Sequence, residues 1–268
     1  MLAVLSPAKS LDFSPTTLPV EPTEPAMMRE ATMLMRTTRG LSQKRIRELM
    51  NLSPELAKLN YERYHSFTQP FDTENALPAG LAFNGDVYRG LDARTLSVDQ
   101  LDWAQDRIAI LSGMFGLLRP LDLIQPYRLE MGTRLKTRRG ENLYAFWGDQ
   151  IAKQIKATLA QHEDSTLVNL ASNEYFKAAK SKTLKSPVVE CVFEDWKSHP
   201  DEGTVIGFLA KYARGLMARY IVTERIGRAE DLKDFKEQRY AFKASRSTPD
   251  RWVFARKFVP VEQARQSA

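Results

Sequence analysis

Cysteine and histidine are scarce in this chain. It has one cysteine, Cys191, and three widely separated histidines, His65, His162 and His199. A single cysteine excludes an internal disulfide and any metal cluster built on several cysteines, and it suits a reducing cytoplasm. Scattered histidines disfavour a zinc or iron site made of imidazole ligands. We therefore expect no metal site and no cofactor.

Long apolar runs are also missing. No apolar stretch approaches the roughly 20 residues needed to cross a bilayer. The first residues, MLAVLSPAKS, have no basic flank before their short apolar run, and a signal peptide requires such a flank. We therefore expect a cytoplasmic protein without signal peptide, anchor or membrane partner, and we expect it to be a monomer.

The charge that is present is predominantly basic. The 268 residues carry a formal net charge of +6, and the isoelectric point is about 9.3. Apolar content of 43% and charged content of 27% fit a folded, globular protein. A basic balance favours association with polyanions, such as nucleic acid or anionic lipid.

Hydrophobic patterning predicts an α/β (mixed α+β) fold. Short apolar runs predict strands at residues 2–5, 108–111, 166–171, 187–196 and 204–209, and a C-terminal hairpin at 240–245 and 252–258. Helical periodicity predicts helices at 97–107, 141–161 and 210–226, and a helical subdomain at about 26–66, inserted after the first strand. We expect one domain over residues 1–268, with a mixed central sheet flanked by helices and a frayed C-terminus.

Residues 111–132, LSGMFGLLRPLDLIQPYRLEMG, stand out from the rest of the chain. Three glycines, two prolines, two arginines and two acids interrupt an otherwise apolar run. Glycine and proline punctuate regular structure, so this segment is predicted to be a set of tight turns between apolar anchors. Such turns either build a functional site or form a structural loop in which Arg119 and Asp122 simply pair.

Polar residues follow two of the predicted strands. Lys9 leaves the first strand, and Glu174 and Lys177 follow the strand at 166–171. In sheets with helical crossovers, such loops line the ligand crevice. Lys9 is therefore a phosphate contact, an amine nucleophile or a solvated surface residue. Asp86 lies in an Asn-Gly-Asp sequence that is typical of a hairpin tip.

Two groups of basic residues are candidate nucleic-acid contacts. The densest positive patch follows Gly132 and consists of Arg134, Lys136, Arg138 and Arg139. At 100° per residue, the helix at 210–226 places Lys211 and Arg214 in one stripe, away from an aromatic face. Either group fits a contact with a phosphate backbone, and either also fits an ordinary solvated surface.

The motifs together resemble the YaaA peroxide-stress protein family. They are SPAKSLDF at 6–13, NGDVYRGL at 84–91, the segment at 111–132, LYAFWGD at 143–149, NLASNEYFK at 169–177 and ARGLMARYI at 213–221. The resemblance implies a cytosolic protein that limits damage by hydrogen peroxide and is associated with lowered free iron. It also implies binding of double-stranded DNA by a single-domain α/β fold with a basic cleft and a helix-hairpin-helix-like element. By motif position, residues 113–116 with Arg119 are the candidate for that element.

Three interpretations of function remain open. The first is a DNA-binding protective protein without a metal cofactor, whose candidate contacts are Arg119, Arg128, Arg134, Lys136, Arg138, Arg139, Lys177, Lys211 and Arg214. The second is an enzyme acting on a nucleobase or nucleotide, with Tyr88, Tyr127 and Tyr175 stacking on a base. Its candidate catalytic residues are Lys9, Asp86, Glu130 and Glu174. The third, iron sequestration, lacks clustered histidine or cysteine.

Overall fold

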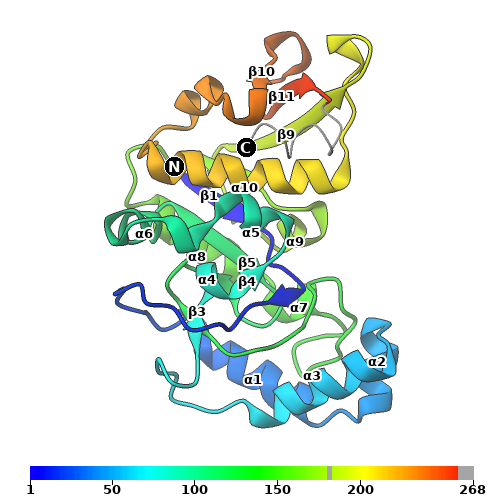
Figure 1. The fold of residues 1–268 in the computed structure, drawn as a ribbon. Coiled ribbons are helices and arrows are strands. Elements are labelled where there is room, and N and C mark those ends of the chain that lie inside the picture. The colour runs from blue at the N-terminus through cyan, green and yellow to red at the C-terminus, as the bar shows by residue number, and fades with distance from the viewer. Residues whose placement is uncertain (180–182, 259–268) are drawn as a thin grey trace.

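One seven-stranded sheet forms the centre of the described chain, in the order β10-β11-β9-β8-β1-β5-β6 (Figure 1). The computed structural model describes residues 1–179 and 183–258, so the expected fraying of the last few residues falls outside it. The strands are β1 (Leu2–Leu5), β5 (Ile108–Ser112), β6 (Gly116–Leu118), β8 (Leu167–Leu170), β9 (Val188–Trp196), β10 (Ala241–Phe242) and β11 (Arg251–Lys257). The strands from β5 to β11 through β1 run parallel, whereas the edge strands β6 and β10 are antiparallel to their neighbours.

Strand β1 occupies the middle of the sheet because every one of its residues is apolar. Leu2 to Leu5 are all at most 1% exposed, as expected for a strand covered on both faces. Ala3 is in register with Ile108 of β5 and with Val168 of β8. The predicted mixed sheet in a single α/β domain is therefore confirmed.

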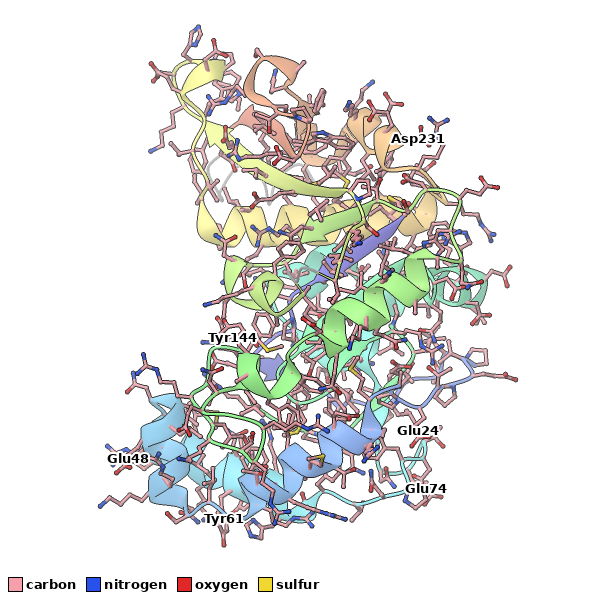
Figure 2. All side chains as sticks on the ribbon, turned by 180° about the vertical axis from the view of Figure 1, so that it is seen from behind. Glu24, Glu48, Tyr61, Glu74, Tyr144 and Asp231 are labelled. Carbon is pink, nitrogen blue, oxygen red and sulfur yellow. The ribbon has the colours of Figure 1, made fainter. Side chains whose placement is uncertain are left out.

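Helices cover both faces of the sheet. On one side lie α5 (Asp86–Leu91), α6 (Val98–Ala104) and the long α10 (Gly207–Thr223), while α8 (Gln150–Leu159) lies on the other side (Figures 1 and 2). Ser97 and Gln100 form the predicted capping box at the start of α6. The predicted helix at 141–161 is instead two helices, α7 (Leu143–Trp147) and α8, because Gly148 between them adopts a positive φ of 50°.

The α5 and α10 helices cross at two glycines. A Cβ atom on Gly90 would overlap the backbone of α10 at Tyr212, and one on Gly215 would overlap the backbone of α5 at Val87. The strand prediction at 204–209 is wrong: Val205 and Phe208 are about half exposed, so this segment does not belong to the covered sheet. There α10 begins at Gly207, and Thr204 forms only an isolated bridge to Asp195.

Residues 26–66 contain three helices, α1 (Met28–Arg39), α2 (Gln43–Met50) and α3 (Pro54–Ser66), which lie together at one end of the molecule (Figure 1). Ser42 and Ser53 cap α2 and α3 by accepting backbone N–H groups, and Pro54 occupies the first turn of α3. Their buried residues, including Leu34, Ile46 and Tyr64, join the core that surrounds the sheet. The division of the chain into a domain and a helical subdomain stays a prediction.

Short elements connect these parts of the fold. Strand β2 (Ser10–Leu11) pairs with β4 (Phe83–Asn84), and β3 (Leu77–Pro78) pairs with β7 (Leu123–Ile124). The remaining elements are α4 (Ala79–Ala82), α9 (Asn173–Ala179), η1 (Ala93–Thr95), η2 (Pro200–Glu202), η3 (Ala229–Asp234), η4 (Glu237–Arg239) and η5 (Ala244–Arg246). The Asn-Gly-Asp sequence does not form a hairpin tip: Gly85 is extended and Asp86 is the first residue of α5.

The helix-hairpin-helix prediction at residues 113–116 is wrong. The turn joins two antiparallel strands, β5 and β6, and Met114 and Phe115 are fully buried. Ser112 Oγ already accepts the backbone N–H groups of Met114 and Phe115, at 3.2 and 2.9 Å. The indole N–H of Trp147 donates to the carbonyl of Gly113 at 3.1 Å. A Gly-x-x-Gly sequence fits a turn between strands as well as one between helices, and burial here excludes a phosphate.

Candidate functional site

A pocket of about 450 Å³ opens at the carboxyl ends of β1 and β8. The chain leaves β1 toward β5 on one side and later returns to β8 on the other side, so the direction of sheet building reverses at β1. In open α/β sheets, ligands bind in the crevice at such a switch point. The loops after these two strands, residues 6–10 and 172–175, supply much of the lining.

All four candidate catalytic residues line this one pocket, together with Arg128. The four are Lys9, Asp86, Glu130 and Glu174. Lys177, which follows the same strand as Glu174 and is a candidate DNA contact, does not line the pocket: its ammonium lies 4.8 Å from the ring centroid of Tyr144. The structure thus brings the strand-end residues together, whereas their catalytic role stays a prediction.

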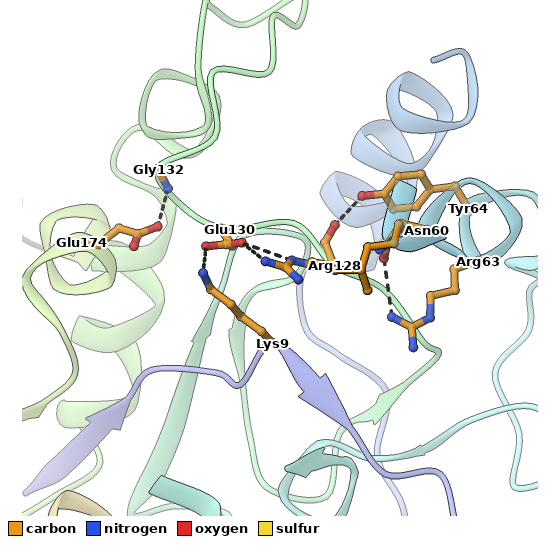
Figure 3. Close-up of polar contacts among 9 residues, drawn as sticks. Lys9, Asn60, Arg63, Tyr64, Arg128, Glu130, Gly132 and Glu174 are labelled. Carbon is orange, nitrogen blue, oxygen red and sulfur yellow. Dashed lines mark hydrogen bonds and ion pairs between the residues drawn. The ribbon is translucent and has the colours of Figure 1, made fainter. Parts of the chain in front are cut away.

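Glu130 lies between two cations (Figure 3). Lys9 Nζ is 2.8 Å from Glu130 Oε2, and Arg128 Nη2 is 2.9 Å from Glu130 Oε1. Burial alone would raise the pKa of Glu130, but the hydrogen bonds and charges of Lys9 and Arg128 outweigh it and hold that pKa below its ordinary value. Glu130 is therefore an ionised carboxylate that fixes the direction of the Lys9 side chain.

The turns at residues 127–132 hold this arrangement in place. The hydroxyl of Tyr64, on α3, donates to the carbonyl of Arg128, and the backbone N–H of Gly132 donates to Glu174 Oε1 at 2.8 Å (Figure 3). Gly113 lies so close to the carbonyl of Leu129 that a Cβ atom would overlap it. Gly113 therefore serves close backbone packing behind the pocket.

Three tyrosine rings form the apolar part of the pocket lining. Tyr88, Tyr127 and Tyr175 are at most 8% exposed. The Tyr88 hydroxyl donates to the carbonyl of Ser6 at 3.0 Å, and the Tyr127 hydroxyl is 2.7 Å from Ser112 Oγ. Burial raises the pKa of all three hydroxyls, so these tyrosines are neutral at physiological pH. Only small parts of their rings reach the pocket, and their hydroxyls are not proton carriers at that pH.

The wall contributed by α10 carries Lys211 and Arg214. Lys211 is exposed, whereas Arg214 is partly buried. Arg214 Nε is buried without a hydrogen-bond partner among the residues that the structure describes. Burial lowers the pKa of its guanidinium, and the charge of Glu190 only partly offsets that effect. Arg214 is thus a cation in the pocket wall that lacks a close counter-ion within residues 1–179 and 183–258.

The other predicted DNA contacts lie outside the pocket. Arg119 forms an ion pair with the buried Asp122 at 3.0 Å. This is the pairing expected if residues 111–132 form a structural loop. Arg134, Lys136, Arg138 and Arg139 are exposed on the strand-free segment that follows Gly132. Two of them have partners: Lys136 pairs with Glu141 at 3.0 Å and Arg139 with Glu30 at 3.3 Å. Their binding role stays a prediction.

Sequence reasoning missed two hydroxyl groups at the centre of the site. Ser6 and Ser172 line the pocket directly after β1 and β8, with their Oγ atoms 3.3 Å apart. Ser6 Oγ also accepts the backbone N–H of Ser172 at 2.8 Å. Their positions in the sequence could have identified them. Each is the first or second residue after a buried strand, and Lys9 and Glu174 follow the same two strands.

No group of three or more histidine, cysteine, aspartate or glutamate side chains in the described part of the chain is placed to hold a metal ion. No helix there is long and apolar enough to span a membrane.

Comparisons with known proteins cover nearly the whole chain. A family model described as peroxide stress protein YaaA matches residues 1–246. A UPF0246 protein of Bordetella petrii is 50% identical over 257 residues, covering 96% of this chain and 100% of the relative. A UPF0246 protein of Bordetella pertussis is 51% identical over 257 residues, covering 96% and 99%. One from a Caulobacter species is 51% identical over 256 residues, with the same coverage.

Proposed function

Because the chain belongs to the peroxide stress protein YaaA family, which gives it a role in peroxide stress, we propose that it acts by binding double-stranded DNA. The DNA lies over the mouth of the pocket and is held by the exposed cations around it. Protection of the DNA from oxidative damage is the outcome of that binding. An association with lowered intracellular free iron is part of the same proposal.

The distribution of charge supports this proposal. Lys9 and Lys211 are exposed at the pocket, and the hydrogen bond from Gly132 to Glu174 ties the pocket to the segment that carries Arg134 and Arg138. These cations add to an overall charge of +6. Clustered lysine and arginine that meet phosphates release counter-ions, and this release supplies most of the affinity in sequence-independent DNA binding.

Fluorescence anisotropy with a labelled duplex tests the proposal. We expect binding at low salt that weakens steeply as salt rises, with a slope of about one counter-ion per phosphate contact. Exchanging Arg134 and Arg138 for glutamine should reduce that slope by about two. Arg228→Gln is the matched control. Arg228 is exposed and lies at the amino end of β1, opposite the end that carries the pocket: the carbonyl of the neighbouring Gly227 accepts a hydrogen bond from the amino group of Met1. Absence of binding, or affinity that does not depend on salt, would refute the proposal.

A measurement in cells tests the iron part. A strain that lacks the protein should show more chelatable iron by electron paramagnetic resonance than the parent strain during peroxide exposure. Equal iron signals in the two strains would remove this part of the proposal and leave the DNA-binding part to its own test.

One observation favours a second function, an enzyme acting on a nucleobase or nucleotide. An amine, Lys9, and three carboxylates, Asp86, Glu130 and Glu174, line the same pocket. In the lysine version, the Lys9 amine attacks the C1′ aldehyde of an abasic deoxyribose, water leaves, and a C=N bond forms. Borohydride would reduce that bond and trap the protein on abasic duplex DNA. An adduct formed by the native chain but not by Lys9→Arg supports this function, and its absence in both excludes the lysine version.

A further inference from the structure

Arg214, in the pocket wall, has a guanidinium whose Nε is buried and receives no hydrogen-bond partner from the described residues. Buried ionic groups are normally paired and fully hydrogen-bonded, because desolvating a charge is costly. Arg256, which is 9% exposed, follows that rule: its Nε lies 2.7 Å from Asp195 Oδ1 and its Nη1 donates to the carbonyl of Gln238. Arg214 has no such contacts within the described residues. A ligand with negative charge would supply them.

The carboxylates that share the pocket with Arg214 are already engaged. Glu130 binds Lys9 and Arg128, Glu174 accepts the N–H of Gly132, and Asp86 pairs with Arg89 on the next turn of α5. Lys211, one turn before Arg214 on α10, has no ion pair among the described residues either. The cations left over therefore lie on the α10 wall, and an anion is the complementary ligand there.

The position of Arg214 is fixed by the backbone. The crossing of α5 and α10 at Gly90 and Gly215 leaves no space for a Cβ atom on either glycine. Arg214 precedes Gly215, so its Cα is held beside residues 85–88, which form the adjoining part of the lining. A guanidinium fixed in this way can present its planar fork to a phosphate and donate two parallel hydrogen bonds.

The rest of the lining suits the remainder of a nucleotide. Tyr88, Tyr127 and Tyr175 line the pocket with the small parts of their rings that stay exposed, and these parts can contact a base. The hydroxyls of Ser6 and Ser172 can bond a sugar or a phosphate oxygen. A volume of about 450 Å³ lies within the range of about 300–1,000 Å³ that small-molecule sites occupy.

We propose that Arg214 and Lys211 bind the phosphate of a nucleotide whose base lies against the tyrosine rings of the pocket. The nucleotide is either a free deoxynucleoside monophosphate or one displaced from a DNA duplex, and in the second case the inference rests on the DNA binding proposed above. The two sources share one chemistry, a phosphate ester next to a stacked base.

Calorimetric titration with dGMP, deoxyguanosine and orthophosphate tests binding of the free nucleotide. We expect dGMP to bind better than either fragment, and to bind about 10- to 100-fold more weakly to Arg214→Gln, because charge-assisted hydrogen bonds to the phosphate are lost. Lys211→Gln, a change at an exposed position, should weaken dGMP binding as well, whereas Arg228→Gln should not. Circular dichroism confirms that each variant is folded.

Anisotropy with two duplexes tests the displaced nucleotide. One duplex is fully paired, and the other carries a single bulged nucleotide that is already outside the stack. The native chain should prefer the bulged duplex by about tenfold, and Arg214→Gln should bind both equally.

The two arms separate the possible results. Dependence on Arg214 in either arm supports the inference and identifies the source of the nucleotide. If dGMP and the bulge preference are both insensitive to Arg214 and Lys211, the inference is refuted, even where duplex binding is intact. If the native chain binds no duplex but binds dGMP through Arg214, the proposed DNA binding fails and the nucleotide site stands.

Discussion

Replacing Arg214 by methionine should stabilise the ligand-free protein. Methionine has a similar unbranched stem, so it keeps much of the packing of the arginine side chain but carries no charge. Leaving a buried polar group without a partner costs about 1–3 kcal/mol. Replacing buried ions by apolar groups of similar volume is often stabilising by about 1–4 kcal/mol. Arg214 keeps some exposure and is attracted by Glu190, which places the expected gain near the lower limit, at about 1–2 kcal/mol.

Urea unfolding measures that gain. The midpoint should rise while the slope stays unchanged, because the surface exposed on unfolding is nearly the same. In a thermal scan, about 1–2 kcal/mol corresponds to a rise of about 2–8 °C for a chain of this size. Lys211→Met is the control: Lys211 is exposed, so its removal should change stability by less than about 0.5 kcal/mol.

Addition of dGMP should stabilise the native chain more than Arg214→Met. At a free concentration of 100 times the native Kd, the ligand should stabilise the native chain by about 2.7 kcal/mol, and a variant that binds it about 10- to 100-fold more weakly by about 0.4–1.4 kcal/mol. A variant that is less stable than the native chain without ligand would refute the reasoning. That result would show that Arg214 is held by favourable interactions of the fold and does not await an anion.

Three further predictions concern the frame of the pocket. Gly215→Ala should destabilise the protein by about 1–3 kcal/mol or more in urea unfolding, because the added Cβ atom overlaps the backbone of α5; Gly227→Ala, where nothing lies within 4 Å of a Cβ atom, should be nearly neutral. Tyr64→Phe should cost about 1–2 kcal/mol, because the carbonyl of Arg128 loses its donor; equal stability would show that water replaces the hydroxyl. The pKa of Glu130 is lower in the folded state than its ordinary value of 4.5. Its ion pairs therefore stabilise the fold fully at a pH above 4.5, and this stabilisation is lost as the pH falls through the pKa of the folded state. The stability difference between the native chain and Glu130→Gln should therefore be larger at pH 7 than at pH 3, and a difference independent of pH would contradict the assignment.

The strands of the parallel sheet could be predicted from the sequence because their burial follows from the apolar residues of each strand alone. Runs such as Leu2–Leu5 and Leu167–Leu170 are apolar throughout, which is typical of strands covered on both faces. Where several structures share one local pattern, prediction failed. Residues 204–209 are apolar enough for a strand, yet Thr204 forms only an isolated bridge and α10 begins at Gly207.

The part of the candidate site that lies at the ends of strands could be predicted from the sequence. Lys9 and Glu174 follow neighbouring parallel strands, so their approach follows from topology alone. The state of Arg214 could not be predicted in this way. On a helical projection it belongs to an ordinary basic stripe with Lys211, and only the folded chain brings it near Glu190 and Cys191 of β9 and partly buries it. Whether a cation has a partner depends on residues far away in the sequence.

The hydrogen bond from Trp147 to Gly113 gives the protein an optical reporter behind its pocket. The indole is fully buried, and its N–H bonds the glycine that packs against the carbonyl of Leu129, a pocket residue. A ligand that moves the pocket backbone would thus alter the surroundings of one fluorophore without touching it. A chain that keeps Trp147 and has phenylalanine at the other three tryptophan positions, 103, 196 and 252, would convert occupancy of the pocket into a change in emission.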